Sequence, residues 1–381
     1  MERLPLTHDA IGPVRRGHPW VYADGVTKRA PAGTPVQLCD ERGRPVAFAL
    51  ADDGPIAARV LARHAESMPR LVARRVAAAA AERPAVLPPD TDAYRVLNGP
   101  GDALPGVVVD RYAHVAVLRL YSSAWLPYVD VLTTALREIP GVRTVLRRLG
   151  VRRVDGDDGV VLLSGPPLDG PVVVKEAGLR FLARPDVGQK TGLFLDQREH
   201  RRFVAGLSPG ATVANLFAYT GGFSVHAAAA GARHVTTVDI SEPALDDARE
   251  NFRLNGLDPA AHAFEAADAF GWTPGSPVDI LVCDPPNLSH GKGSDRAASV
   301  AYRDLNRTVG AHVQQGGILA TASCTARLSR DRWEQAVREG LRSSGRWSWL
   351  WRAAEPPDHP VALDHPEGRY LKFAALRRRS G

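Results

Sequence analysis

One cysteine in this sequence stands where a nucleophile would be useful. Cys324 follows the apolar run 317–322 and lies in a polar Ser-Cys-Thr turn. A thiolate there can add to carbon 6 of a cytosine, so that carbon 5 becomes able to take a methyl group before the thiolate leaves. The alternative is a small buried hydrophobic residue, which we prefer for Cys283 inside another apolar run. We predict that Cys324 is the catalytic nucleophile.

A second chemical group ends the apolar run 278–283. Asp284 is followed by two prolines and Asn287, and the prolines favour an extended, rigid exit from a strand. Asp284 and the backbone oxygens beside it would then grip a flat base next to a methyl donor. Similar Asp-Pro-Pro segments occur in methyltransferases that act on amino nitrogens and on ring carbons. The motif therefore predicts a nucleobase acceptor without choosing its atom.

Three further features indicate a crevice that binds a nucleoside. In the segment 215–224, Asn-Leu-Phe-Ala-Tyr-Thr-Gly-Gly-Phe-Ser, Gly221 and Gly222 let the backbone approach a ligand closely. Asp239 ends the next apolar run, where its carboxylate can accept hydrogen bonds from both ribose hydroxyls. Asp268 is expected to face an adenine. Taken singly, the glycines could form an ordinary turn and Asp239 could cap a helix.

The turn also argues against a dinucleotide cofactor. Such an enzyme would show G-x-G-x-x-G and a helix N-terminus open for pyrophosphate, and this spacing is missing here. A ligand with ribose and adenine but no phosphate fits better, which indicates S-adenosylmethionine. The predicted cofactor-binding residues in these segments are Asn215, Phe217, Tyr219, Thr220, Gly221, Gly222, Asp239, Ile240, Asp268, Ala269 and Asp284.

Alternating elements must position these residues. Strands are expected at 178–183, 212–217, 234–239, 278–283, 317–322, 347–351 and 370–376, and helices at 222–230, 242–255, 299–313 and 330–342. This alternation is typical of a parallel sheet with helices on both faces, a Rossmann-like α/β fold. Its ligands bind beyond the carboxyl ends of the strands, where the candidate residues lie. Ser241 is placed to cap one helix, with Pro243 in its first turn.

The first half of the chain has a different pattern. Short β-like runs at 34–38, 45–50 and 55–61, separated by turn residues, predict a small β-barrel. A helix at 67–82 follows, and then strands at 107–110, 114–121, 144–148 and 160–163 with a helix at 125–138, which predict an α+β module. We therefore expect three domains, at 1–65, 66–180 and 181–381.

Composition limits the partners. The net charge of +6 suits a polyanion because lysines and arginines release counterions from phosphates, although abundant arginine alone explains it too. No run of about 18 apolar residues exists and the start has no apolar signal segment, so we expect a cytoplasmic protein without a membrane span. The three cysteines are far apart without a CxxC pair, which argues against disulfides and zinc. We predict no metal, and a homodimer stays open.

The whole pattern resembles the RlmI-type 23S ribosomal RNA (cytosine-C5-)-methyltransferases, which join an N-terminal PUA domain, a central α+β domain and a class I methyltransferase domain. The resemblance covers nearly the whole chain and rests on the segments 16–22, 101–112, 188–198, 215–224, 284–286, 323–325, 358–360, 365–367 and 370–373. It implies S-adenosylmethionine contacts from Gln197 and Arg198, Cys324 as the attacking thiol and Asp284 as the group that meets the cytosine. The chain departs from relatives at Asn287 and Leu288, where they often carry Lys, Ala or Thr followed by an aromatic residue.

The PUA-like N-terminal domain suggests that the positive charge serves to bind ribosomal RNA. Arg15, Arg16, His18 and Trp20 combine cations with an aromatic face, as RNA-binding surfaces do, although Trp20 could instead lie in the barrel core. Lys292 lies in a Gly-rich loop that is either a lid ordered by substrate or a solvated connector.

Other functions stay open. One is methylation of a guanine nitrogen such as N7, or of another base, with Cys324 not acting as a nucleophile. The other is a non-catalytic RNA-binding protein.

Overall fold

The computed structural model describes residues 1–149, 159–187, 191–288 and 295–380, and it divides into two compact units. The first unit comprises Met1–Gly178, Ala183–Leu195 and Pro357–Gly368, and the second comprises Leu179–Leu182, Asp196–Pro356 and Arg369–Gly381. The barrel and the middle module both belong to the first unit, together with a segment from near the C-terminus. The three domain boundaries expected above stay a prediction.

The N-terminal part is a five-stranded sheet with the order β1-β3-β4-β5-β2. Its strands are β1 (Glu2–Pro5), β2 (Trp20–Tyr22), β3 (Pro35–Cys39), β4 (Pro45–Ala51) and β5 (Ile56–Ala62). The helix α1 (His8–Arg16) was missing from the prediction because it contains Gly12 and Pro13, two residues with low helix propensity. It ends at Gly17, which has a φ of 116°. Glycine adopts this left-handed conformation easily because it has no Cβ.

The middle module is a five-stranded sheet with the order β10-β9-β8-β7-β6. Its elements are α2 (Met68–Glu82), β6 (Ala93–Asn98), β7 (Val107–Tyr112), β8 (Val115–Leu120), α3 (Val129–Arg137), β9 (Thr144–Leu149) and β10 (Val160–Ser164). The prediction of four strands was wrong because it left out β6, where Arg95 interrupts the apolar pattern. Its guanidinium is neutralised by Asp110 of β7, with Nε 2.8 Å from Oδ1.

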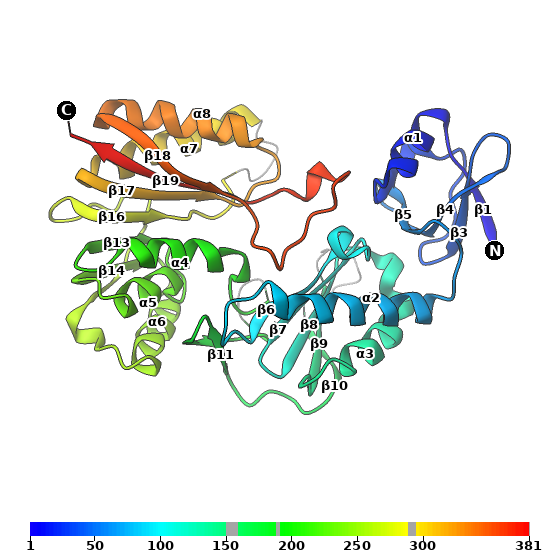
Figure 1. Cartoon of the computed structure of the whole chain (residues 1–381), viewed down its shortest axis with the longest axis horizontal. Helices are drawn as coiled ribbons and strands as arrows, with labels where there is room; N and C mark the ends of the chain where they lie inside the picture. The colour runs from blue at the N-terminus through cyan, green and yellow to red at the C-terminus, as the bar shows by residue number, and fades with distance from the viewer. Residues whose placement is uncertain (150–158, 188–190, 289–294, 381) are drawn as a thin grey trace. The chain divides into compact units, whose positions relative to one another are not determined.

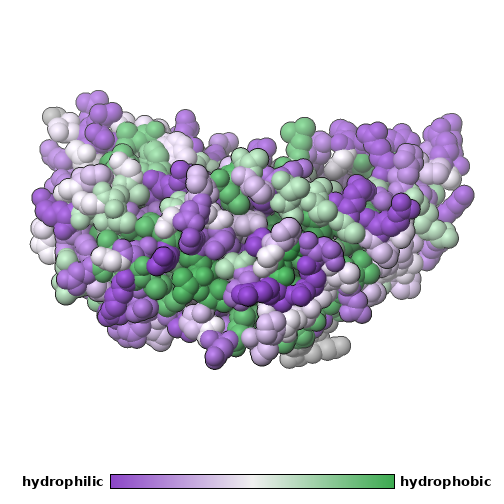
Figure 2. Space-filling model, turned by 60° about the horizontal axis from the view of Figure 1, so that its bottom comes forward, coloured by the Kyte–Doolittle hydropathy of each residue, from purple (hydrophilic) through white to green (hydrophobic). Residues whose placement is uncertain are grey.

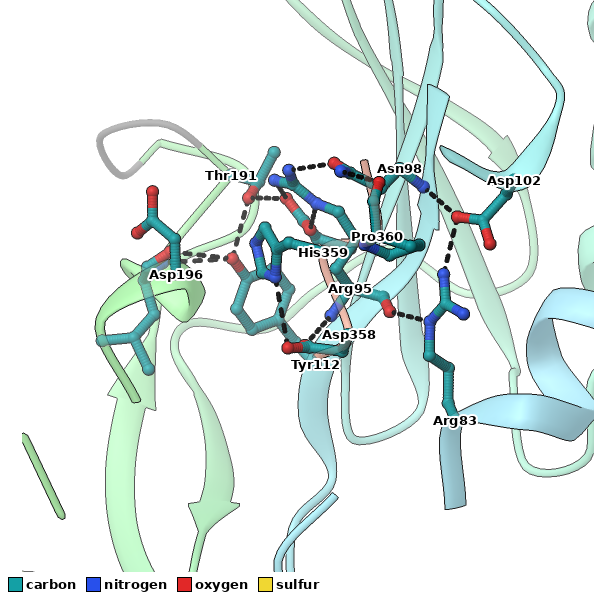
Figure 3. Close-up of polar contacts among 12 residues, drawn as sticks. Arg83, Arg95, Asn98, Asp102, Tyr112, Thr191, Asp196, Asp358, His359 and Pro360 are labelled. Carbon is teal, nitrogen blue, oxygen red and sulfur yellow. Dashed lines mark hydrogen bonds and ion pairs between the residues drawn. The ribbon is translucent and has the colours of Figure 1, made fainter. Parts of the chain in front are cut away.

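The middle module also binds two segments that lead directly into the second unit (Figure 3). The backbone N–H of Arg95 donates to Oδ2 of Asp358 at 3.0 Å. The side chain of Asn98 donates to the carbonyl of Pro360 at 2.9 Å. In the other segment, the hydroxyl of Thr191 donates to Asp110 at 2.6 Å. These contacts fix the chain shortly before Asp196 and shortly before Arg369, where the second unit resumes.

The second unit contains a seven-stranded sheet with the order β15-β14-β13-β16-β17-β19-β18. The strands β11 (Val172–Glu176) and β12 (Leu179–Ala183) form a separate two-stranded sheet. The strands of the seven-stranded sheet are β13 (Thr212–Leu216), β14 (His234–Asp239), β15 (Ala263–Ala266), β16 (Val278–Cys283), β17 (Val313–Ser323), β18 (Arg346–Ala353) and β19 (Lys372–Arg379). The helices are α4 (Arg198–Leu207), α5 (Gly222–Ala229), α6 (Glu242–Leu254), α7 (Asp295–Ala311) and α8 (Arg330–Leu341).

Helices cover both faces of this sheet: α4, α5 and α6 lie on one side, and α7 and α8 on the other (Figure 1). The expectation of a Rossmann-like α/β unit is confirmed, but the expectation of a purely parallel sheet is wrong. The strands β13 to β17 are parallel, whereas β19 runs antiparallel to both β17 and β18. The periodicity of single strands could not reveal this direction. The antiparallel strand matters because it starts beside the end of β17.

Hydrophilic residues cover much of the face drawn in Figure 2, with hydrophobic patches between them. Within the described residues, no helix is both long and apolar enough to cross a membrane.

Candidate active site

Four neighbouring parallel strands share one row of paired residues near their carboxyl ends. The paired residues of this row are Val238, Leu216, Cys283 and Thr321. The next residues along the chain are therefore neighbours: Asp239 is the last residue of β14, and Phe217 and Asp284 directly follow β13 and β16. Cys324 directly follows Ser323 at the end of β17. The strand order changes direction between β13 and β16, which is where α/β sheets bind ligands. The sheet thus brings the predicted cofactor and catalytic residues to one edge.

The two glycines after β13 lie where side chains would not fit. Gly221 has a φ of 75°, and a Cβ on it would come within 2.9 Å of the Ala248 side chain. A Cβ on Gly222 would lie 3.0 Å from Cδ of Arg201. The turn is therefore tightly packed on its protein side, where only a residue without a Cβ fits at these two positions.

The turn before the glycines is strained and is held in place by Asp239. Phe217 and Tyr219 have φ values of 56° and 50°, which L-residues other than glycine rarely adopt and which often mark functional sites. Oδ2 of Asp239 accepts a hydrogen bond from the Tyr219 N–H at 2.7 Å, and Oδ1 accepts one from the Ser241 N–H at 3.0 Å. Each carboxylate oxygen has a second lone pair, which leaves acceptor capacity for ribose hydroxyls.

The capping prediction for Ser241 is confirmed. Its hydroxyl accepts from the Ala244 N–H at 3.3 Å, and Pro243 lies in the first turn of α6.

Buried polar residues support the turn from the protein side. Asn215 donates to Oγ of Ser224 at 2.9 Å, and the Thr237 hydroxyl donates to the same atom at 2.8 Å. The side chain of Asn251 donates to the Thr220 carbonyl at 2.8 Å. Thr237 and Asn251 were missed in the sequence, because an isolated polar residue in a strand or helix gives no signal of its partner.

Two exposed apolar side chains flank the place predicted for an adenine. Ile240 is 77% exposed and Phe270 is 47% exposed. Phe270 also packs edge-on against Phe217, with ring centroids 5.0 Å apart. Asp268 accepts a hydrogen bond from the Phe270 N–H at 3.0 Å, and Ala269 is buried. The glycine turn, the carboxylate of Asp239 and the apolar side chains of Ile240 and Phe270 together fit an adenosine-containing cofactor. The sequence had not predicted Phe270.

Gln197 connects the entry of α4 to the end of β16. Its Nε2 donates to Oδ2 of Asp284 at 2.8 Å, and its Oε1 accepts from Nδ1–H of His200. His200 stacks on Phe373 with ring centroids 4.1 Å apart, and burial lowers its pKa to about 3, so it is neutral. Arg198, also predicted to bind the cofactor, is fully buried, with Nε 3.2 Å from Glu199.

The two cysteines of the second unit have different surroundings. Cys283 is buried inside β16, and burial together with Asp284 raises its pKa, which keeps it a thiol. Cys324 is half-buried beyond the end of β17. This contrast agrees with the preference for Cys324 as the nucleophile.

Tyr302 of α7, which had no sequence signal, lies between the two loops that carry the candidate catalytic residues. It is fully buried, and burial raises the pKa of its hydroxyl. The Ser323 side chain and the Leu288 backbone lower this pKa, while Cys324 and Asp284 raise it. One buried side chain thus interacts with both loops.

In the first unit, the predicted RNA-binding residues separate into two groups. Arg15 and Arg16 are exposed, whereas His18 and Trp20 pack against residues 365–367. Nε2 of His18 lies 3.5 Å from Glu367, and the Trp20 ring centroid is 4.3 Å from that of His365. The contacts of His18 and Trp20 are therefore intramolecular, and Trp20 is half-buried against His365 rather than in the core of the N-terminal sheet. Lys292 lies outside the described residues.

Arg15 and Arg16 line an open surface groove together with Arg42 and Arg44. These arginines come from α1 and from the turn between β3 and β4. The groove also contains acidic residues, and Asp40 pairs with Arg44 at 2.8 Å. Arg42 and Arg44 were not among the predicted residues, because the turn that holds them has the sequence of an ordinary connector.

Within the described part of the chain, no cluster of three or more histidine, cysteine or acidic residues could hold a metal ion.

The fold and this site define an S-adenosylmethionine-dependent methyltransferase. The family model of that description matches residues 131–369, and a PUA-like domain model matches residues 4–63. Among curated proteins, the ribosomal RNA large subunit methyltransferase of Deinococcus radiodurans is 41% identical over 98% of this chain and 97% of its own. The ribosomal RNA large subunit methyltransferase I of Erwinia tasmaniensis is 33% identical over 98% of this chain and 99% of its own. The chain belongs to the S-adenosylmethionine-dependent methyltransferase family that includes these proteins.

Solved structures agree on the fold. A protein from Streptococcus mutans assigned as a SAM-dependent methyltransferase superposes with a TM-score of 0.86 at 23% identity, covering 99% of this chain and 100% of its own. A structure of a protein also assigned as a methyltransferase, complexed with SAH, has a TM-score of 0.88 at 23% identity, with the same coverage.

Proposed function

We propose that this protein methylates carbon 5 of a cytosine in 23S ribosomal RNA, the RNA of the large subunit, with Cys324 as the nucleophile. The observation that carries this proposal is the position of Cys324, one residue beyond β17 and beside the Asp284 loop at the cofactor edge of the sheet. The names of the full-length relatives support ribosomal RNA as the substrate. The PUA-like domain and the exposed Arg15 and Arg16 supply a surface suited to RNA phosphates.

In the proposed reaction the thiolate of Cys324 is first the nucleophile and later the leaving group. Its sulfur bonds to carbon 6 of cytosine, which shifts the ring electrons toward carbon 5. Bound S-adenosylmethionine supplies the electrophilic methyl group. A base then removes the proton from carbon 5, those electrons re-form the double bond between carbons 5 and 6, and the sulfur leaves as a thiolate. The target base must be looped out to enter this crevice.

Asp284 is the group proposed to hold the cytosine. Its Oδ2 already accepts a hydrogen bond from Gln197, which orients the carboxylate. The following Pro285 is buried and stiffens the loop. A carboxylate fixed in this way can accept a hydrogen bond from the exocyclic amino group of cytosine. The glycine turn, Asp239 and Ile240 are proposed to hold the cofactor.

The test uses ribosomal RNA from cells that lack this protein, purified wild-type enzyme and labelled S-adenosylmethionine, followed by mass mapping of the modified nucleotide. We expect 5-methylcytosine with the wild type and none with Cys324→Ala. Cys283→Ala is the matched control and should retain methylation, since Cys283 is enclosed in β16. RNA carrying 5-fluorocytidine should form a covalent adduct with the wild type and not with Cys324→Ala.

Two results would replace this proposal. If Cys324→Ala still methylates the RNA and the product is a methylated guanine or another base, Cys324 is not a nucleophile. If the wild type binds RNA but transfers no methyl group and shows no calorimetric binding of S-adenosylmethionine, the chain is a non-catalytic RNA-binding protein.

A further inference from the structure

A buried lysine lies beside the end of the strand that leads to Cys324. Lys372 is the first residue of β19 and pairs with Ser323, the last residue of β17. Its side chain is only 3% exposed. A lysine is almost never buried this deeply unless its charge has a partner. The antiparallel pairing of β19 with β17 therefore sets an ammonium group next to the proposed nucleophile.

The contacts of the ammonium group hold the turn that carries Cys324. Nζ of Lys372 donates to the carbonyl of Thr325, the residue directly after Cys324. It also donates to the carbonyl of Tyr370 at 3.2 Å. The hydroxyl of Tyr370 in turn donates to Asp196 at 2.7 Å, which fixes the start of β19. The lysine thus ties the Cys324 turn to β19.

We infer that Lys372 is a positioning residue for Cys324, which holds its turn and supplies the positive charge that stabilises its thiolate. This inference rests on the proposed role of Cys324 as nucleophile. When the thiol ionises, its proton goes to solvent and Lys372 stays protonated. The sulfur then carries the electron pair that attacks the base, so no proton passes through the lysine.

The electrostatics around Lys372 support this arrangement. Burial lowers its pKa to about 8, and Arg330 lowers it as well, while Glu355 and Cys324 raise it. The attraction that raises the pKa of Lys372 acts equally on Cys324, because a thiolate that stabilises the ammonium form of Lys372 is itself stabilised by that ammonium.

The other ionisable groups near the pair come from separate elements. Tyr302 of α7 interacts with both Cys324 and Asp284, and each of these two groups raises the pKa of its hydroxyl, so Tyr302 stays neutral beside the proposed thiolate. Glu355 lies after β18 and accepts the N–H of Leu371 at 2.7 Å. The alternative role for Lys372 is thus a purely structural partner of Glu355.

The experiment measures the ionisation of Cys324 without using methyl transfer. The rate of alkylation of Cys324 by iodoacetamide is followed by peptide mass spectrometry from pH 5 to pH 10. We compare wild type, Lys372→Met, Lys372→Arg and the control Lys175→Met, whose lysine pairs with Asp90 in the first unit. Calorimetric binding of S-adenosylmethionine verifies that each variant is folded.

We expect the wild-type midpoint to lie about one pH unit or more below that of an ordinary thiol. Lys372→Met should raise the midpoint by a similar amount and slow alkylation at pH 7 about tenfold, whereas Lys372→Arg and Lys175→Met should keep a low midpoint. An unchanged midpoint in folded Lys372→Met overturns the inference and leaves the proposed function standing. If Lys372→Met does not fold, a wild-type midpoint at or above that of an ordinary thiol overturns it. Failure of the proposed function would instead appear as methylation of the RNA, at cytosine or at another base, by Cys324→Ala.

Discussion

Gln197 donates its side-chain N–H to Asp284 at 2.8 Å, although the two residues are far apart in the sequence. The orientation of the Gln197 amide is fixed from the other side, because its oxygen accepts from His200. A neutral histidine stacked on Phe373 thus determines, through one amide, how the Asp284 carboxylate lies. The chain of three residues joins α4 to the loop after β16.

Gln197→Glu is expected to weaken catalysis by replacing the donor to Asp284 with a second carboxylate. We expect kcat/KM to fall about 10- to 100-fold, because the half-buried Asp284 carboxylate loses its hydrogen-bond donor and is repelled by the new carboxylate. Methyl transfer to ribosomal RNA under saturating and limiting conditions measures this. The matched control is Gln335→Glu, an exposed change beside Glu339 on α8, which should leave kcat/KM unchanged. Equal rates in both variants would contradict the role of Gln197.

His200 should make the protein less stable in acid. Its folded pKa of about 3 lies below the ordinary 6.5, so the unfolded state binds more protons between these values. The free energy of unfolding therefore falls as pH decreases through this window, by up to about 1.4 kcal/mol per pH unit from this group.

His200→Asn, which can still donate to Gln197, should remove this part of the pH dependence. Urea unfolding at pH 7, 6, 5 and 4 measures the slope, and the exposed His8 provides the control variant His8→Asn. A slope identical in wild type and His200→Asn would show that His200 is not kept neutral by the fold.

Gly221→Ala should impair cofactor binding as well as stability. The new Cβ would meet Ala248 at 2.9 Å, and the φ of 75° disfavours any L-residue. Gly231→Ala separates the two effects, since Gly231 also has a positive φ but nothing lies within 4 Å of its Cβ. We expect about 1 kcal/mol lower stability for Gly231→Ala with unchanged affinity for S-adenosylmethionine. Gly221→Ala should lower both, and equal calorimetric affinities would argue against a cofactor turn.

Gly101→Ala should release the segment 357–368 from the middle module. A Cβ on Gly101 would lie 1.8 Å from the Pro360 carbonyl oxygen, so the segment must move. We expect the free energy of unfolding to fall by about 1–3 kcal/mol and limited proteolysis to cut within 357–368. Gly54→Ala, with nothing within 4 Å of its Cβ, should change neither. Resistance to protease in both variants would show that this contact is dispensable.

Much of the fold followed from local patterns in the sequence. The alternation of apolar runs and amphipathic segments after residue 180 determined the strands and helices of the α/β unit, and the predicted bounds of β14 and β16 agree with the structure. The paired glycines and the acidic strand ends predicted a cofactor site, and the structure brings these residues to one edge of the sheet. Cys324 and Cys283 were distinguished by their neighbours alone. These signals are local because helix and strand periodicity depends on residues a few positions apart.

Only the tertiary structure decided which side chains become partners. The antiparallel direction of β19 brings Lys372 to the Cys324 turn, and α7 inserts Tyr302 between two loops. Gln197 meets Asp284 because the start of α4 lies within hydrogen-bonding distance of the loop after β16. Periodicity encodes which face of an element is buried, but not which element will cover that face. Long-range sheet order and helix packing supply that information, and with it the electrostatic environment of the proposed nucleophile.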